Sequence, residues 1–131
     1  MKCKMYCIFA KESLDKMKGS RGKLASMAGH AYLHAFWNCL QQSDSIDYMA
    51  LKMRQASQYK ESEKAYKITL VVDTVAELKE LYEEYKNQCG VSLVTDSALT
   101  VFDEPTTVCL GLGPISEEII GDSLKILKTL T

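Results

Sequence analysis

The stretch 19–31 holds the densest group of side chains that could do chemistry, reading Gly-Ser-Arg-Gly-Lys-Leu-Ala-Ser-Met-Ala-Gly-His-Ala. It follows a short apolar run and leads into a segment whose apolar residues have helical spacing, so backbone N–H groups and cations would meet at a helix start. Arg21 and Lys23 would supply positive charge there. The small or polar residues beside them are Lys18, Ser20 and Gly22. The stretch therefore predicts a site for an anionic group.

Two common phosphate-binding loops are excluded by the spacing of these residues. A Walker A loop has Ser or Thr after Gly-Lys, but Gly22-Lys23 is followed by Leu24, and Gly19 is too close to Gly22. The dinucleotide pattern Gly-x-Gly-x-x-Gly is also missing from this stretch. The residues alone thus support anion binding in general and no particular nucleotide.

His30 lies two helical turns beyond Lys23, so the two side chains can border one face of the expected helix. A base and a cation would then line one cleft. The alternative is a core histidine whose ring bonds a neighbouring carbonyl, and His34 has the same two interpretations. We expect Met27 and Trp37 in the core, because apolar side chains at helical spacing usually pack there.

A second candidate is the stretch 95–100, Thr-Asp-Ser-Ala-Leu-Thr, directly after a predicted strand. Sites in α/β proteins usually lie at the carboxyl ends of strands. Asp96 could act as an acid or base beside the hydroxyl of Thr100, or it could simply cap a turn. The order Ser-His-Asp and a nucleophile elbow are not present in the sequence.

Apolar runs and helical periodicities alternate along the chain and predict the elements that would position these residues. The expected strands cover 5–10, 65–72, 91–94 and 107–112, and the first of them reads as a central strand buried on both faces. The expected helices cover 23–40, 44–60, 75–89 and 116–130. This alternation predicts one α/β domain over residues 1–131, a three-layer α/β/α sandwich with a small sheet of four strands.

Several residues are expected to begin or end these elements. Asp44 is the predicted N-cap of the second helix, and Asp73 or Thr74 that of the third. Gly90 would stop the third helix, and Gly113-Pro114 would close the last strand. Ser116 would begin the last helix, with acids in its first turn and lysines near its end.

Composition indicates an ordinary globular domain, with 131 residues of which 47% are hydrophobic and 25% charged. No apolar run reaches the roughly 20 residues that a membrane-spanning helix needs, and the start of the sequence does not resemble a signal peptide. The five cysteines include no CxxC pair, so we expect reduced thiols, no zinc site and a cytoplasmic location.

Positive charge is concentrated at the start of the sequence. Residues 1–23 contain seven Lys or Arg and two acidic residues, a local charge of +5 in a chain whose formal charge is −1. Such a segment could face phosphates, because contacts with nucleic acid depend on local charge. The alternative is an ordinary solvated lysine surface.

These motifs, in this order, resemble the type-2 peptidyl-tRNA hydrolases of archaea and eukaryotes. The family's K-G-K-[ILV]-A-A-Q-x-x-H-A stretch corresponds to residues 21–31, its D-A-G-x-T signature to 96–100, and its closing T-V-L-x-[IV]-G-P to 108–114. The resemblance implies a mixed four-stranded sheet, a homodimer, no metal or other cofactor, and hydrolysis of the ester between a peptide and tRNA. The site residues that it implies are Lys23, His30, Asp96 and Thr100, with Arg21 and nearby lysines meeting RNA phosphates.

The chain departs from the family pattern at several positions. Met27 stands where the family has glutamine, Ser26 where it has alanine, Ala98 where it has the signature glycine, and Pro105 where a glycine precedes the last strand. Methionine lacks the donor and acceptor of the amide. The sequence therefore leaves three hypotheses open: a peptidyl-tRNA hydrolase, a catalytically impaired relative that works as a dimeric binding or adaptor module, and a hydrolase of another ester or amide.

Overall fold

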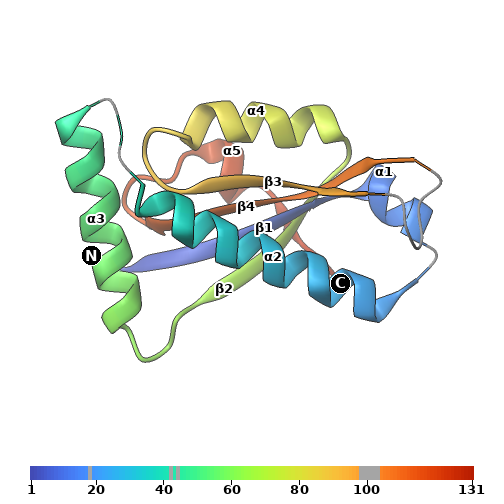
Figure 1. Cartoon of the computed structure of the whole chain (residues 1–131), viewed down its shortest axis with the longest axis horizontal. Coiled ribbons are helices and arrows are strands. Elements are labelled where there is room, and N and C mark those ends of the chain that lie inside the picture. Colours follow the sequence, from blue (N-terminus) through green and yellow to red (C-terminus); the bar gives the residue numbers. More distant parts are fainter. Residues whose placement is uncertain (18, 42, 44, 98–103) are drawn as a thin grey trace.

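The computed structural model describes residues 1–17, 19–41, 43, 45–97 and 104–131. Its centre is a five-stranded sheet in the order β3-β4-β1-β2-β5 (Figure 1). The strands are β1 (Cys3–Ala10), β2 (Lys67–Val72), β3 (Val91–Asp96), β4 (Thr106–Ser116) and β5 (Lys128–Thr129). The predicted α/β class with a mixed sheet is confirmed, and the sheet has one strand more than expected.

Strand β1 lies in the middle of the sheet, as its continuous apolar run predicts. It pairs in parallel with β2 and antiparallel with β4. Strand β3 is antiparallel to β4 and therefore runs in the same direction as β1. The carboxyl ends of β1, β2 and β3 thus meet at one edge of the sheet, the edge at which α/β proteins usually place their sites.

Helices cover both faces of this sheet. Helices α2 (Arg21–Cys39) and α3 (Ile46–Glu61) lie on one face, while α4 (Val75–Tyr85) and the short α5 (Asp122–Lys125) lie on the other (Figure 1). Side chains of β1 alternate between the two layers: Phe9 packs in a cluster with residues of α2, and Ile8 packs in a cluster with residues of α4. A short helix α1 (Lys11–Leu14) and a 3-10 turn η1 (Asp15–Met17) connect β1 to α2.

Helix α2 lies unusually close to the sheet, because small residues meet at the contact. Its buried side chains recur every four residues: Met27, Ala31, Ala35 and Cys39. A Cβ on Gly111 of β4 would collide with the carbonyl group of Ala31, and a Cβ on Gly90 before β3 would collide with that of Ala35. Because these two glycines have no side chain, α2 packs directly against β4 and the start of β3. The first turn of α2 then lies near the edge of the sheet where β1, β2 and β3 end.

The predicted helix over 116–130 is wrong. Strand β4 continues through Gly113 and Pro114 to Ser116, because its end pairs with the first residues of β1 and the buried Gln55 side chain accepts the Ser116 N–H at 2.9 Å. Helix forms only over Asp122–Lys125, after Gly121. The chain then adds β5 to the outer edge of β2. Tertiary pairing thus overrides the helical charge pattern of this segment.

Element ends also differ from expectation. Ser45 caps α3 by accepting the N–H of Tyr48, while the predicted cap Asp44 lies outside the described residues. Thr74 caps α4, as one of the two alternatives predicted. Helix α4 ends at Tyr85, so Gly90 serves the close approach of α2 and does not stop the helix. Within the described part of the chain, no helix is long and apolar enough to cross a membrane.

Candidate active site

The candidate site lies at the edge where β1, β2 and β3 end. Asp96 is the last residue of β3, and the first turn of α2 lies over the same edge. Ser20 starts that turn, since its hydroxyl accepts the N–H of Lys23 at 3.4 Å. Lys23 precedes Met27 by four residues, so it extends the row of α2 side chains that face the sheet. Helix and strand together bring a cation and an acid to one place.

Lys23 and Asp96 form the shortest contact between charged groups at this edge. The Lys23 ammonium lies 2.6 Å from Oδ2 of Asp96. The Asp96 side chain is 2% exposed, and the Lys23 side chain is 25% exposed. A charge-assisted bond of this length, shielded from water on the acid's side, is stronger than a surface ion pair. The carboxylate therefore fixes the position of the ammonium, which still reaches solvent.

This arrangement suits acyl transfer. An ammonium has three N–H donors, so Lys23 can bond Asp96 and still donate to an oxygen that gains negative charge. Preorganised donors of this kind stabilise a tetrahedral oxyanion. The alternative role for Asp96, that of a turn cap alone, does not account for its bond to a residue on another element.

His30 does not join the ion pair. Its exposed ring stacks on His34, with ring centroids 3.9 Å apart. Seven residues separate it from Lys23, about 10 Å along the helix axis. Partial burial and the neighbouring His34 lower the pKa of His30 from its usual value. The interpretation of His30 as a core histidine is wrong, and its role in the site stays a prediction.

Two other predicted site residues, Lys18 and Thr100, lie outside the described residues. Arg21 and Gly22 are exposed on the first turn of α2, beside the half-buried cap Ser20. A Cβ on Gly22 would meet open space, so this turn is accessible to a ligand. Ser20, Arg21 and Gly22 thus lie at the same helix start as Lys23.

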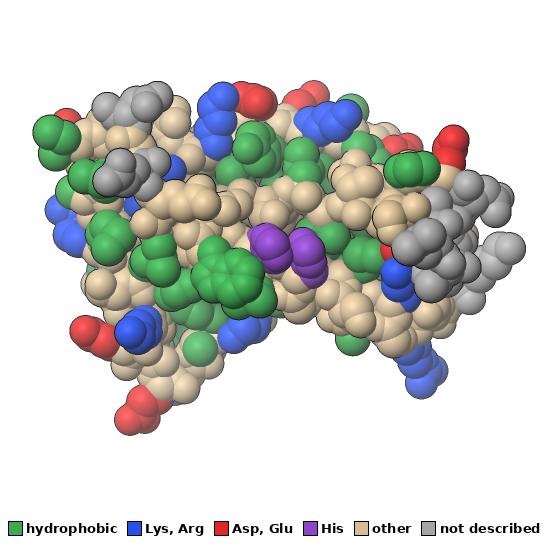
Figure 2. Space-filling view, in the orientation of Figure 1, with side chains coloured by type: hydrophobic (Ala, Val, Ile, Leu, Met, Phe, Trp, Pro, Cys, Tyr) green, Lys and Arg blue, Asp and Glu red, His purple; other side chains and the backbone are tan. Residues whose placement is uncertain are grey.

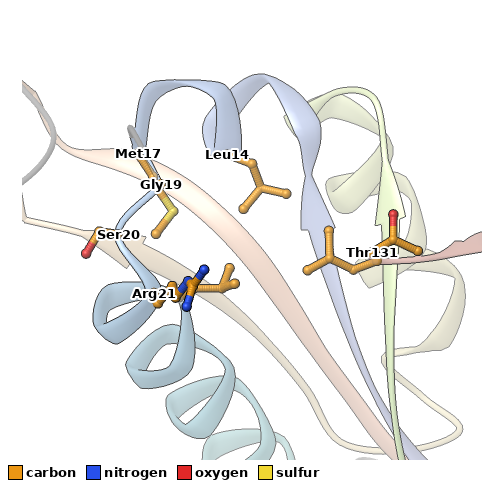
Figure 3. A pocket seen from close by; sticks show the side chains of 8 residues that line it. Leu14, Met17, Gly19, Ser20, Arg21 and Thr131 are labelled. Atoms are coloured by element: carbon orange, nitrogen blue, oxygen red, sulfur yellow. The ribbon is translucent and has the colours of Figure 1, made fainter.

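A pocket of about 320 Å³ opens beside this turn, between α1, η1 and the last residues of the chain (Figure 3). Leu14, Met17, Leu24 and Leu130 give it an apolar lining, and Arg21 stands at its side. The sequence pattern did not reveal this pocket, because its walls come from segments more than 100 residues apart.

The cationic segment 1–23 is divided between the two ends of the sheet. Lys2 and Lys4 precede or begin β1 and lie 3.9 Å and 3.0 Å from carboxylate oxygens of Glu117. Lys23 and Arg21 lie at the opposite end, beyond Ala10. Of these four residues, only Arg21 and Lys23 can contribute charge to the candidate site.

The departures from the family pattern fall in different surroundings. Met27 is buried, in a cluster with Cys7, Val94 and Cys109, so it places no polar group beside Lys23. Ser26 and Pro105 are exposed, and Ala98 lies outside the described residues. The expectation of a core position is confirmed for Met27. It is wrong for Trp37, which is 51% exposed.

The cysteines have free thiols, as predicted. All five are free and buried. Burial raises the pKa of the Cys3 thiol to about 11, and burial also raises those of Cys39 and Cys89. Over the described ranges, no group of three or more His, Cys, Asp or Glu side chains could hold a metal ion.

Comparison with known proteins agrees with the order of the motifs. Residues 3–130 match the family model of peptidyl-tRNA hydrolase PTH2. A peptidyl-tRNA hydrolase of Methanopyrus kandleri is 35% identical over 105 residues, covering 79% of this chain and 81% of the relative. A peptidyl-tRNA hydrolase of Methanothermobacter thermautotrophicus is 31% identical and covers 87% of this chain and 91% of the relative. One of Methanococcus maripaludis is 30% identical and covers 88% of this chain and 92% of the relative.

The match runs through every strand of the sheet and through both elements that carry the Lys23–Asp96 pair. With its mixed sheet and the pair at the edge where the parallel strands end, this chain belongs to the peptidyl-tRNA hydrolase PTH2 family.

Proposed function

We propose that this protein hydrolyses the ester that joins a peptidyl or other N-acyl-aminoacyl group to the 3′ end of tRNA. The observation that carries the proposal is the Lys23–Asp96 contact of 2.6 Å, in which a buried carboxylate holds a partly exposed ammonium at the site edge. Membership of the family and the activity named for its archaeal relatives support the same reaction.

In this reaction, Lys23 would donate to the carbonyl oxygen of the ester as it becomes an oxyanion. Asp96 would orient Lys23, accept a proton from the attacking water, and return that proton to the 3′ oxygen of the tRNA as the ester bond breaks. Thr100 would hold that water, and His30 would position the substrate from the next turns of α2. No residue needs to form a covalent intermediate, because water itself attacks the ester.

The tRNA would meet the start of α2. Arg21 and Lys18 would contact phosphates, and Ser20 and Gly22 would leave room for the backbone of the RNA to approach. Such contacts give affinity without reading sequence, and they weaken as salt displaces bound protein from the phosphates. The substrate is therefore recognised partly through charge near the site.

The test is the release of labelled N-acyl-amino acid from acylated tRNA by the purified protein. We expect release by the wild type, and a decrease of roughly 100-fold or more for Asp96→Asn, which keeps the size of the side chain and removes its charge. The rate at subsaturating RNA should fall as salt rises. Thermal melting of the variant separates lost chemistry from lost folding.

Lys125→Ala provides the matched control for the RNA contacts. Lys125 is exposed on α5, on the sheet face opposite α2, so its loss should leave both rate and salt dependence unchanged. Arg21→Ala should weaken binding and reduce the salt dependence. A folded wild type that released no amino acid, beside an active relative in the same assay, would refute the proposal.

A second candidate is a binding or adaptor module without catalysis, favoured by one observation. Met27 packs into the core at the position where the family pattern has glutamine, so this side chain offers no amide to the site. This candidate predicts RNA binding with no release, and gain of release in Met27→Gln combined with Ala98→Gly. The third hypothesis, hydrolysis of another ester or amide, predicts Asp96-dependent turnover of small acyl esters.

The family resemblance further supports a homodimer that works in the cytoplasm without a cofactor. Sedimentation velocity at several protein concentrations tests the dimer, with a sedimentation coefficient that rises toward that of two chains as the expected result. Activity that survives dialysis against a chelator tests the absence of a metal requirement. Fractionation of cells that express the chain tests its location.

A further inference from the structure

Three aromatic rings form a row on the outer side of α2. The rings of His30 and His34 stack, with an interplanar angle of 9°. Trp37 meets His34 edge to face, with centroids 5.1 Å apart. Figure 2 shows the two histidines side by side near the middle of this face, with hydrophobic side chains beside them. We call these three residues the aromatic row.

The row is accessible to a ligand. His30 is exposed, His34 is half-buried, and Trp37 is 51% exposed. The rings contact one another and stand apart from the core clusters of the described residues. The exposed parts of these rings present apolar area on which another ring could stack.

The row also lines up with the candidate site. Lys23, His30 and Trp37 follow one another at seven-residue spacing, so they lie within about 40° of each other around the helix. The distance along the axis from Lys23 to Trp37 is about 21 Å. A strand of a few nucleotides covers such a length. A chain held at Lys23 by its 3′ end could therefore continue over the rings.

We propose that the aromatic row binds the unpaired 3′ tail of the RNA substrate by stacking its bases on the free face of His30 and on Trp37, while His34 packs against the other face of His30. Single-stranded bases stack on aromatic side chains without sequence preference, and unpaired ends are the part of an RNA whose faces are free for this. The tail would run along α2 and deliver its terminal ester to Lys23 and Asp96, while Arg21 meets the adjoining phosphates. This proposal rests on the proposed function and adds where the tail lies.

The experiment uses the full chain and two RNA hairpins that differ only in an unpaired 3′ tail. Trp37 is the single tryptophan, so its fluorescence reports this surface alone. We expect the tailed hairpin to quench Trp37 and the blunt hairpin to leave it unchanged. Anisotropy of labelled RNA should show that His34→Ala and Trp37→Ala weaken binding of the tailed hairpin by roughly 5- to 150-fold each.

Two variants separate stacking from general damage. Trp37→Phe keeps an aromatic face and should retain most of the affinity. Leu33→Ala removes a side chain of similar exposure, 48%, on the same helix and should bind the tailed hairpin like the wild type. Melting curves verify that each variant is folded.

Equal binding and equal fluorescence with tailed and blunt hairpins would overturn the proposal. So would Trp37 fluorescence that shifts with protein concentration and ignores RNA, because a second copy would then cover the row. Both results are independent of hydrolysis: a protein that releases amino acid but shows no quenching retains the proposed function and loses this inference. Quenching of Trp37 without release of amino acid would support the stacking of the RNA tail and count against the proposed function.

Discussion

Two lysine–carboxylate pairs stand at opposite ends of the same sheet, and they differ in burial. At the carboxyl end of β3, the Asp96 side chain is 2% exposed and lies 2.6 Å from the Lys23 ammonium. At the start of β1, the Glu117 side chain is 40% exposed and lies 3.0 Å from Lys4. The first pair is shielded by the fold, and the second is open to water and salt.

This difference in burial explains why one of the two ion pairs is suited to catalysis and the other is not. Solvent screens Glu117, so its bond to Lys4 can break and re-form at small cost. Asp96 cannot be rehydrated without moving the chain around it, so Lys23 stays in place and keeps its charge where a substrate can reach it. We expect chemistry at the first end and only surface electrostatics at the second.

The largest expected effect is on catalysis. Lys23→Ala removes the donor that would meet the oxyanion, so release of amino acid from acylated tRNA should fall roughly 100- to 1,000-fold. Lys4→Ala removes the same charge from the same segment and should leave the rate unchanged. Steady-state kinetics of both variants in one assay decide the matter, and equal losses would mean that only net charge counts.

The next effect is on stability. Lys23→Ala leaves a buried carboxylate without its ammonium, so we expect the free energy of unfolding to fall by about 2 to 3 kcal/mol. Lys4→Ala should have a much smaller effect, which vanishes in high salt. Urea denaturation at two salt concentrations measures both. Adding Asp96→Asn to Lys23→Ala should restore part of the loss, and a further large decrease would contradict the account.

A smaller effect concerns acid titration at the exposed end. The hydrogen bond from Lys4 lowers the pKa of Glu117. The pair therefore contributes stability above the ordinary glutamate pKa and loses it as pH falls through the lowered value. Carboxyl carbon chemical shifts followed by NMR should show this low pKa, and Lys4→Ala should move it back toward the ordinary range. An unchanged titration in the variant would show that the bond does not persist in solution.

The smallest effect lies between the two ends, on α2. Burial, and then the charge of His34, lower the pKa of His30. Because the folded protein disfavours the charged ring, stability should decrease slightly as pH falls below the usual histidine value of about 6.5. NMR titration should place His30 below that value, and His34→Ala should raise it only in part, since burial is the larger cause. A His30 that titrates normally would contradict the stacked geometry.

Local pattern predicts much of this molecule because some segments have a single good arrangement. The continuous apolar run of β1 predicts a central strand, and the helical spacing of apolar residues predicts α2. The segment 116–130 is different. Its acids and lysines suit a helix, but Ser116 completes a strand that Gln55 and β1 stabilise from outside the segment.

The same distinction applies to the site. The sequence predicts Lys23 and Asp96, because each follows a strand at a helix start or a strand end and each falls in a family motif. The sequence does not show that Lys2 and Lys4 lie at the opposite end of the sheet from Lys23. These lysines are close to Lys23 in the sequence, but the length of β1 separates them in space. The sequence also places Trp37 in the core, because helical spacing alone does not identify which apolar side chain lies at the edge of the buried face.

The most direct test of the central claim is the single-turnover rate of ester hydrolysis for Asp96→Asn and Glu117→Gln, measured side by side on saturating acylated tRNA. Each substitution neutralises one carboxylate that pairs with a lysine at one end of the sheet. We expect a loss of roughly 100-fold or more for Asp96→Asn and a wild-type rate for Glu117→Gln. A folded Asp96→Asn protein that hydrolyses the ester at the wild-type rate would contradict the central claim.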